Sequence, residues 1–289
     1  MSSVSEPSTL EEASEALRAA ASASIDRAGG EVVVSTAKLN RVLEHEPGDL
    51  TAIVEAGLRL SELQRHLAAH GQMLGLDPPG DPTVGACLAA DLSGPRRHRY
   101  GAMRDLVIGV TIVLADGTIA SSGGKVVKNV AGYDLGKLFS GSHGRLGLIA
   151  RVALRLHPRP AAEATVVAET EDPEATWQTI HRSQLEPSAV DVLPGKRVAL
   201  LFEGPQAAVD AQVAASPGRP AGAEIWEESA TLQSGSAARA PFVWQECLVG
   251  RPGPGIAYLA GAATVASPRA WSPLAERVRA SFDPKGILV

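Results

Sequence analysis

The stretch that decides the fold is residues 106–120, which read LVIGVTIVLADGTIA. From Leu106 to Leu114 both alternating sets of positions are largely apolar, so an extended chain here has no polar face. A strand of this kind lies in a sheet that is covered on both sides. Asp116 and Gly117 supply a hairpin turn, after which residues 118–120 return as a second strand. The pattern predicts a hairpin in the middle layer of a sheet-containing domain.

Around this hairpin the first half of the chain alternates between helical and extended patterns. The expected elements are a helix over 10–23, a short strand over 32–34, a hairpin over 41–56, an amphipathic helix from Ser61 and a long strand over 146–156. The run His157-Pro158-Arg159-Pro160 ends that strand and is typical of a domain boundary.

After Pro160 the pattern changes to the order strand, helix, strand, strand, helix, strand. These elements are expected over 164–169, 173–185, 188–193, 197–203, 205–215 and 223–227, and a final helix over 273–282. The order is typical of a ferredoxin-like open-faced sandwich. The sequence therefore predicts an α+β protein with one domain over 1–160 and a second over 161–289.

Composition excludes several classes of function. The chain has 289 residues and a net charge of −5, so it has no bulk positive field for nucleic acid or anionic lipid. Two cysteines, Cys87 and Cys247, are too few for a disulfide framework, a structural zinc site or an iron–sulfur cluster, and no metal is expected. No signal peptide or spanning helix is recognisable, which predicts a cytoplasmic protein that meets a membrane only through a partner.

The first segment with chemical potential is residues 77–90, DPPGDPTVGACLAA. A Pro-rich turn leads into a helix start made of small residues, where free N–H groups can hydrogen-bond a phosphate. The alternative is a tight loop in front of a packed helix.

The second segment, residues 93–105, reads SGPRRHRYGAMRD and carries four arginines in an acidic protein. An anion site, a docking surface for an acidic partner and a solvated loop all remain open. Asp105 reads as a loop cap rather than a base.

The third segment, residues 123–147, is punctuated by glycines. His143 is either a catalytic base or, more in keeping with its isolation from other ligand-type residues, a polar loop residue. Tyr133 and Phe139 are expected in the core. Motifs for serine hydrolases, P-loops, zinc proteases and Rossmann nicotinamide sites are absent from the sequence, so no catalytic residue is assigned.

Taken together, several strings resemble one family. They are TVGA at 83–86, SGPR at 93–96, RYG at 99–101, LADGT at 114–118, KNVAGYDL at 128–135, the GSxGxLG pattern at 141–147 and FDPxG at 282–286. This set is similar to the FAD-binding subunits of glycolate oxidases, within the vanillyl-alcohol-oxidase group of PCMH-type flavoproteins.

The resemblance implies a two-lobed PCMH-type FAD-binding domain followed by a smaller ferredoxin-like cap domain, with the C-terminal helix returning to the first domain. It implies FAD as cofactor and oxidation of a small 2-hydroxy acid, such as glycolate, to the 2-oxo acid. It also implies two partners, a related flavoprotein subunit and an iron–sulfur subunit that receives the electrons.

By the same resemblance, a set of positions is expected to bind the cofactor and to line one cleft. They are Pro79, Thr83, Val84, Gly85, Ala86, Ser93, Gly94, Tyr100, Gly101, Asp105 and Ile149.

The chain departs from the family at several places, among them Ala86, where a glycine is usual, and Asp91, where asparagine is common; the largest departure lies near the N-terminus. Only residues 25–31 join the first helix to the strand at 32–34, where the family has a Gly-rich pyrophosphate loop and a further strand. Two interpretations follow: a flavoprotein subunit that binds FAD weakly by itself, or a flavin-free structural subunit of the same kind of complex.

Overall fold

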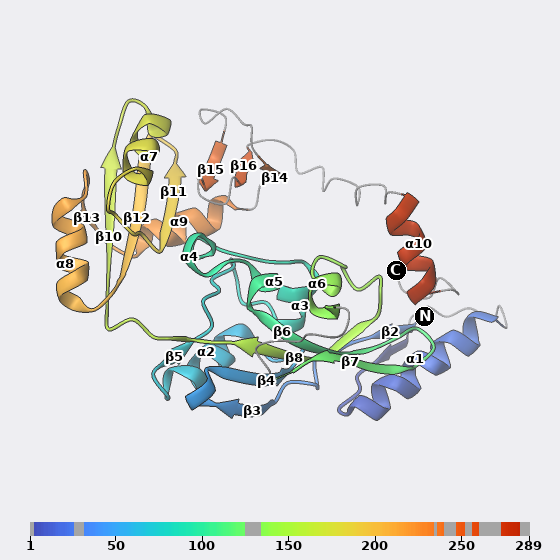
Figure 1. Ribbon diagram of the computed structural model, residues 1–289. Coiled ribbons are helices and arrows are strands. Elements are labelled where there is room, and N and C mark those ends of the chain that lie inside the picture. Colours follow the sequence, from blue (N-terminus) through green and yellow to red (C-terminus); the bar gives the residue numbers. More distant parts are fainter. Residues whose placement is uncertain are drawn as a thin grey trace.

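The computed structural model describes residues 3–25, 32–124, 134–233, 236–239, 247–251, 256–259 and 273–283. Two large antiparallel sheets organise this part of the chain, and Figure 1 shows them side by side, each with its own helices. Within the described residues the first sheet takes its strands from 42–123 and 148–155, and the second takes its strands from residues 162–259.

The first sheet has the strand order β3-β4-β8-β6-β7. Its strands are β3 (Val42–Glu46), β4 (Thr51–Glu55), β8 (Leu148–Arg155), β6 (Val107–Val113) and β7 (Ile119–Gly123). The predicted hairpin is confirmed, since β6 pairs with β7 on one side and with β8 on the other. Thr111 and Ser121 lie opposite each other, and their hydroxyl oxygens are 2.9 Å apart.

Both faces of this sheet are covered, as the apolar pattern predicts. Ile112 points into a core shared with the helices α2 (Leu60–Ala68), α3 (Val84–Ala89), α5 (Met103–Leu106) and α6 (Leu135–Phe139). Its neighbour Val113 packs on the opposite face against Leu10 and Leu17 of α1 (Leu10–Ile25). Phe139 is fully buried, in agreement with the sequence.

A short parallel pair extends the N-terminal part of the molecule. β1 (Ser3–Ser5) pairs with β2 (Val32–Val34), and α1 lies between them in the chain. The helix begins after Thr9, whose Oγ1 accepts the N–H of Glu12 at 3.1 Å. Residues 26–31, part of the shortened connection, lie outside the described residues.

The second sheet begins with the ferredoxin-like order. β13 (Arg219–Ala221), β10 (Ala162–Glu169), β12 (Arg197–Gly204) and β11 (Ala189–Leu193) are neighbours in that sequence. β15 (Cys247–Arg251), β16 (Ile256–Leu259) and β14 (Ser236–Arg239) continue the sheet beyond β11. The helices α7 (Pro173–His181) and α8 (Gln206–Ala215) cover one face through Trp177 and Val209.

The predicted strand at 223–227 is wrong. That stretch begins the helix α9 (Glu224–Leu232), and the edge strand is the shorter β13 before it. Ile225, Trp226 and Leu232 pack as one helical face against the side of the sheet that α7 and α8 leave open. The Trp226 indole N–H also donates to Thr165 Oγ1 on β10 at 2.9 Å, which fixes the helix across the sheet.

Two short segments lie between the sheets or return from the second to the first. β5 (Gln72–Met73) pairs with β9 (His157–Pro158) beside the connection that leads to β10. The last described helix, α10 (Pro273–Phe282), places the Phe282 ring 6.0 Å from the Phe139 ring. The division into two domains at residue 160 stays a prediction. Of the helices in the described ranges, none combines the length and the apolar character needed to cross a bilayer.

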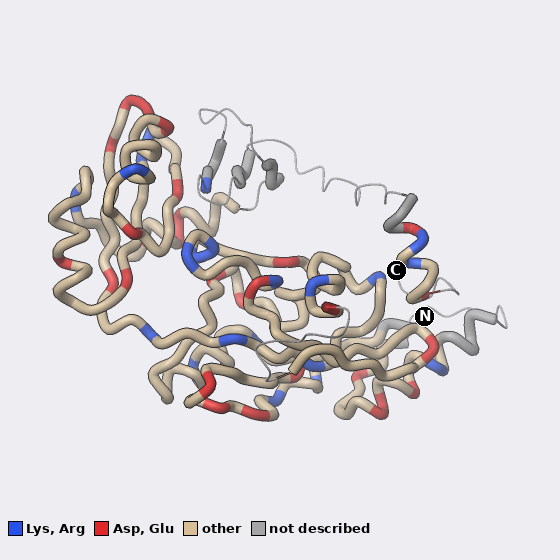
Figure 2. Tube along the Cα trace, in the orientation of Figure 1, with Lys and Arg blue, Asp and Glu red and all other residues tan. Residues whose placement is uncertain are grey.

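The arginine-rich loop joins the two sheets. It contains α4 (Arg97–Tyr100), where arginine positions follow one another along the chain next to the second sheet (Figure 2). Just before this helix, Arg96 Nη2 lies 2.8 Å from Glu203 Oε1 and 3.2 Å from Glu163 Oε2. The side chain of Glu203 is completely buried, so Arg96 is the cation that keeps this carboxylate neutralised.

Two further side chains of the same loop contact the second sheet. Arg99 Nη1 donates to Ser188 Oγ at 3.1 Å and to the Glu203 carbonyl at 3.2 Å. The Tyr100 hydroxyl donates to Glu203 Oε2 at 3.2 Å. Of the three interpretations of the loop, a solvated charge run is therefore wrong for these residues, which bind the protein's own second sheet.

We expect Glu203→Ala to lower the free energy of unfolding by about 2–4 kcal/mol, because Arg96 would lose its buried partner. The loss stays below that of a fully buried pair, since the Arg96 side chain is 27% exposed. The control is Glu163→Ala, which removes a carboxylate that is 60% exposed and costs about 0–1 kcal/mol. Urea unfolding measures both, and equal effects would show that Glu203 does not fix the junction.

Candidate functional site

The loop at 77–83 leads into α3, where the sequence predicts free phosphate-binding N–H groups. Thr83 caps the helix, with its Oγ1 accepting the N–H of Ala86 at 3.2 Å. The N–H groups of Val84 and Gly85 donate to the carbonyls of Leu58 and Ala56, at 2.9 and 2.7 Å. The expectation of free donors in this first turn is therefore wrong, because they attach α3 to the chain that leaves β4.

The small residues at Gly85 and Gly94 also have internal causes. A Cβ on Gly85 would lie 2.8 Å from the Ala56 Cβ, and one on Gly94 would lie 1.8 Å from the Asp77 carbonyl oxygen. Both glycines let two segments of the protein pack closely. Both glycines are explained without a cofactor. Their assignment to the cofactor-binding surface stays a proposal.

Two places beyond the ends of α3 have groups without an internal partner. Before the helix, Pro79 is exposed, and Gly80 has a φ of 73° with nothing within 4 Å of the place that a Cβ would occupy. Beyond the other end of the helix, the Ser142 hydroxyl is buried without a hydrogen-bond partner. Gly141 and His143 fix its loop, through N–H bonds of 3.1 and 2.8 Å to the carbonyls of Leu88 and Ala89.

These open groups fit an extended cofactor in part. A buried hydroxyl without a partner is costly unless a ligand or water satisfies it. Gly80 and Ser142 lie at opposite ends of α3, a helix about 9 Å long at 1.5 Å per residue. A dinucleotide can reach both ends, while the donors between them are already used. The fit of the residues to FAD therefore holds before the start of α3 and beyond its end. It fails at the first turn of the helix.

The remaining predicted positions have partners within the protein. Ser93 Oγ accepts a bond from Arg97 at 3.1 Å, and the Tyr100 ring lies 4.8 Å from the His157 ring. Asp105 accepts the Ala102 N–H at 2.9 Å and so caps its loop, as the sequence indicates. Gly101 adopts a φ of 84° beside Asp105. Ile149 is buried in the core above the first sheet.

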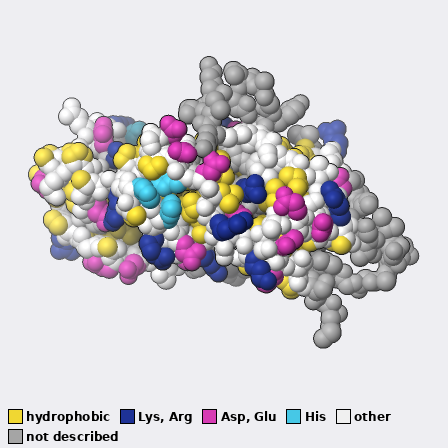
Figure 3. All heavy atoms as spheres, turned by 90° about the horizontal axis from the view of Figure 1, so that it is seen from below, with side chains coloured by type: hydrophobic (Ala, Val, Ile, Leu, Met, Phe, Trp, Pro, Cys, Tyr) yellow, Lys and Arg dark blue, Asp and Glu magenta, His cyan; other side chains and the backbone are white. Residues whose placement is uncertain are grey.

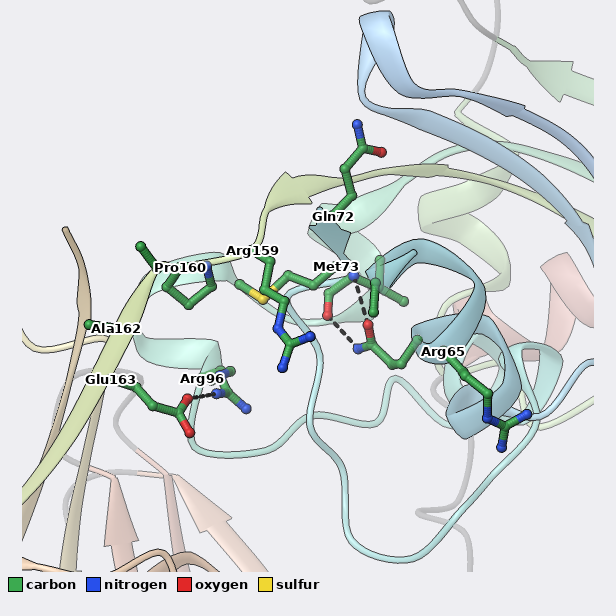
Figure 4. A pocket seen from close by; sticks show the side chains of 12 residues that line it. Arg65, Gln72, Met73, Arg96, Arg159, Pro160, Ala162 and Glu163 are labelled. Atoms are coloured by element: carbon green, nitrogen blue, oxygen red, sulfur yellow. Dashed lines mark hydrogen bonds and ion pairs between the residues drawn. The ribbon is translucent and has the colours of Figure 1, made fainter. Parts of the chain in front are cut away.

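A pocket of about 590 Å³ lies at the connection between the sheets, lined from α2, β5, Arg96 and the start of β10 (Figure 4). None of the eleven predicted positions lines it. Figure 4 shows the Arg159 side chain between Arg96 and Arg65, and the Arg96 guanidinium paired with Glu163. Within the described ranges neither Arg65 nor Arg159 has a carboxylate within 4 Å, so the pocket can hold an anionic group. The sequence signal for this pocket was Arg159, which lies in the run at 157–160 that was interpreted only as a domain boundary.

Burial changes the protonation of several groups near the junction. Desolvation raises the pKa of Asp77 to about 7, although Arg96 opposes this. The Arg96 N–H donates to both Asp77 oxygens, at 3.1 and 3.2 Å. Burial also raises the pKa of Tyr100 and lowers the pKa of His98 and of His157, so both imidazoles are held in their neutral form.

Two sequence interpretations concern the third segment. Residues 125–133, including most of the KNVAGYDL string and Tyr133, lie outside the described residues. His143 is exposed with a φ of 51°, and its backbone holds the loop against α3, which supports the loop interpretation rather than a base. No catalytic residue is assigned.

Comparison with known proteins identifies the kind of domain. Residues 2–123 match the FAD-binding domain family. Over 179 residues the chain is 34% identical to a mitochondrial D-lactate dehydrogenase (cytochrome) of Saccharomyces cerevisiae, covering 61% of this chain and 30% of that protein. Over 192 residues it is 32% identical to the glycolate oxidase subunit GlcE of Escherichia coli, covering 65% of this chain and 55% of that protein.

The solved structures agree on the fold. An alkyldihydroxyacetonephosphate synthase superposes with a TM-score of 0.74 and 17% identity, covering 99% of this chain and 76% of that one. The fold is thus α+β and contains a PCMH-type FAD-binding domain, and FAD is the cofactor that this kind of domain binds. The chain spans between about a quarter and just over half of the length of the first curated relatives it matches.

We expect Gly85→Ala to destabilise the cofactor-free protein by about 1–3 kcal/mol, because its Cβ would overpack Ala56. Ala86→Val is the control, since Ala86 is exposed on the same turn and its change should cost less than about 1 kcal/mol. Thermal unfolding without FAD compares them. A stable Gly85→Ala protein that has lost FAD affinity would instead assign this glycine to the cofactor.

The pKa of Asp77 predicts a pH dependence of stability. Because its pKa is raised to about 7 from an ordinary 3.8, the folded protein keeps a proton that the unfolded chain has released. The resulting stabilisation is complete below pH about 4 and is lost as the pH rises to about 7. We expect Asp77→Asn to flatten this fall in the free energy of unfolding between those values.

The control is Asp81→Asn in the same loop. Hydrogen bonds from Ser61 lower the pKa of Asp81, so its contribution has the opposite sign and is lost as the pH falls. Urea unfolding at several pH values, with the carboxyl ¹³C shift of Asp77 as a direct readout, distinguishes the two. An Asp77 carboxyl that titrates near 4 would contradict the prediction.

Proposed function

We propose that this chain is the FAD-binding subunit of an oxidoreductase that converts a small 2-hydroxy acid, such as glycolate or lactate, to the 2-oxo acid. The observation that carries the proposal is the match of residues 2–123 to the FAD-binding domain family. The substrate class is supported by the names of the relatives, which include D-lactate dehydrogenases and glycolate oxidase subunits.

In this proposal the chain contributes binding groups at both ends of α3. We assign to FAD the exposed backbone at Gly80 and the hydroxyl of Ser142, which is buried until its loop moves, and Pro79 and Ala86 offer exposed surface. Bound FAD supplies the two-electron acceptor. Tyr100 and Ser93 lie at the junction, held by Glu203 and Arg97, and orient the loop that faces the second sheet.

Recognition of a 2-hydroxy acid requires a cation for its carboxylate. Arg96 is unsuited, because Glu203, Glu163 and Asp77 already surround it. Arg159 reaches into the pocket and has no carboxylate partner in the described ranges, so it is our candidate for binding the substrate carboxylate.

Electrons must leave the chain through a partner. Only two cysteines are present, too few for an iron–sulfur cluster. Relatives are named as subunits GlcD and GlcE of glycolate oxidase. We therefore assign this chain two partners, a related flavoprotein subunit and an iron–sulfur subunit, and a cytoplasmic location with membrane association only through them.

One alternative keeps the complex but removes the flavin from this subunit. It is favoured by the first turn of α3, where Val84, Gly85 and Ala86 use their N–H groups internally. The short connection over residues 25–31 adds to it, because about seven residues are too few for a strand and a phosphate-binding loop. In this case the chain is a scaffold with an inherited fold.

We expect the isolated chain to bind FAD with a Kd in the micromolar range. Two missing charge-assisted hydrogen bonds at about 1.5–3 kcal/mol each correspond to an affinity about 10²–10⁴-fold below that of a complete site. Quenching of FAD fluorescence during titration measures it. Stoichiometric submicromolar binding would show that the missing loop is dispensable, and no saturation at all would favour the scaffold.

Two variants and one reaction sharpen the test. Ser142→Ala should weaken FAD binding about 5–15-fold without loss of stability, because its hydroxyl has no internal partner. Ser140→Ala in the same loop is the control, since its hydroxyl donates to Asp91 at 2.9 Å.

Anaerobic addition of D-lactate or glycolate to the FAD-loaded protein should bleach the flavin absorbance. A flavin that binds but is not reduced would contradict the substrate class while leaving the cofactor assignment intact.

A further inference from the structure

Three histidines meet on the surface of the first sheet, away from the predicted cofactor positions. His45 lies on β3, His66 on α2 and His70 two residues after the end of that helix. Their ring centroids are 4.7 to 5.5 Å apart. Figure 3, which views the molecule from below, shows them as one patch of histidine on the surface. One potential ligand nitrogen from each ring lies within 4.8 Å of the other two.

The hydrogen bonds of two of these rings leave one lone pair on each. His70 Nδ1 lies 3.2 Å from the His66 carbonyl oxygen, and a carbonyl can only accept, so Nδ1 carries the proton and Nε2 has the lone pair. Gln72 donates its amide nitrogen to the Pro47 carbonyl at 2.7 Å. Its Oε1 must therefore accept from His45 Nε2 at 2.9 Å, which leaves the lone pair on His45 Nδ1.

The third ring has one nitrogen without a hydrogen bond. His66 Nε2 is buried and makes no hydrogen bond in the described part of the chain. A buried polar nitrogen without a partner is costly, and a metal ion would satisfy it. Metal-binding histidines usually donate a hydrogen bond from the opposite ring nitrogen to a carbonyl or amide oxygen. Here His45 and His70 both have one.

We propose that His45, His66 and His70 form a binding site for a divalent transition metal of the zinc class. Three imidazole nitrogens exclude Mg²⁺ and Ca²⁺, which require oxygen ligands, and favour Zn²⁺. Tetrahedral Zn²⁺ with bonds of about 2.0–2.1 Å places its ligand nitrogens about 3.3 Å apart. The ligand nitrogens lie at most 4.8 Å apart, so metal binding requires small rotations of these side chains.

The site would tie the β3–β4 hairpin to the C-terminal end of α2. Because three protein ligands leave the fourth position of a tetrahedral ion open, water or a side chain from a partner can complete it. The inference does not depend on the flavin, since none of the three histidines belongs to the cofactor-binding positions.

The test is calorimetric titration of the tag-free, full-length protein with Zn²⁺. We expect one ion per chain, and a rise in Tm of roughly 5–10 °C at a hundredfold excess of Zn²⁺ over its Kd. His70→Gln and His45→Gln should each weaken binding by about 100-fold or more. His181→Gln is the matched control, because His181 is an exposed histidine at the end of α7 and should leave binding unchanged.

Two further measurements keep the proposal falsifiable. Co²⁺ in place of Zn²⁺ should give the intense visible bands of four-coordinate cobalt, and Mg²⁺ should neither bind nor raise the Tm. Because His70 is exposed, its variant should fold even if His45→Gln does not. Absence of saturable Zn²⁺ binding in the wild type, or binding that survives His70→Gln, would overturn the site.

Discussion

The ion pair between Arg96 and the buried carboxylate of Glu203 is the interaction on which the arrangement of the whole molecule depends. A buried carboxylate without its cation is strongly destabilising, so the arginine loop must stay against the second sheet. The same loop presses Gly94 onto the carbonyl of Asp77, and that residue begins the segment leading into α3. The position of the helix beside the candidate cofactor site is thus linked, through two loops, to the relative placement of the two sheets.

Local patterns in the sequence predicted most of the fold. The apolar residues on both faces of 106–114 predicted a covered strand, and the order of elements after residue 160 predicted the ferredoxin-like neighbours β13, β10, β12 and β11. The strand predicted at 223–227 is wrong, because five apolar-rich residues fit a strand or a helix equally well. The stretch forms a helix because the second sheet has an open face, against which Ile225 and Trp226 pack.

The candidate site was less predictable, because its chemistry depends on partners far away in the sequence. The motif at 83–86 correctly marked the start of a helix, but not that Ala56 and Leu58 would take its N–H groups. Arg96 could be interpreted as an anion site because Glu203, more than a hundred positions later, has no local signature. The histidine cluster joins residues from a strand and a helix, and only folding shows that they meet.

The contact between the rings of Phe139 and Phe282 has a consequence for biosynthesis. Val278 and Phe282 pack against the core that the first sheet shares with α3 and α6. On the ribosome, every strand of that sheet emerges well before α10 does, so an apolar patch on a nearly complete core stays uncovered while the second sheet is still being translated. The nascent chain is therefore exposed to aggregation over this interval, and chaperones that bind apolar surface have a defined window in which to act.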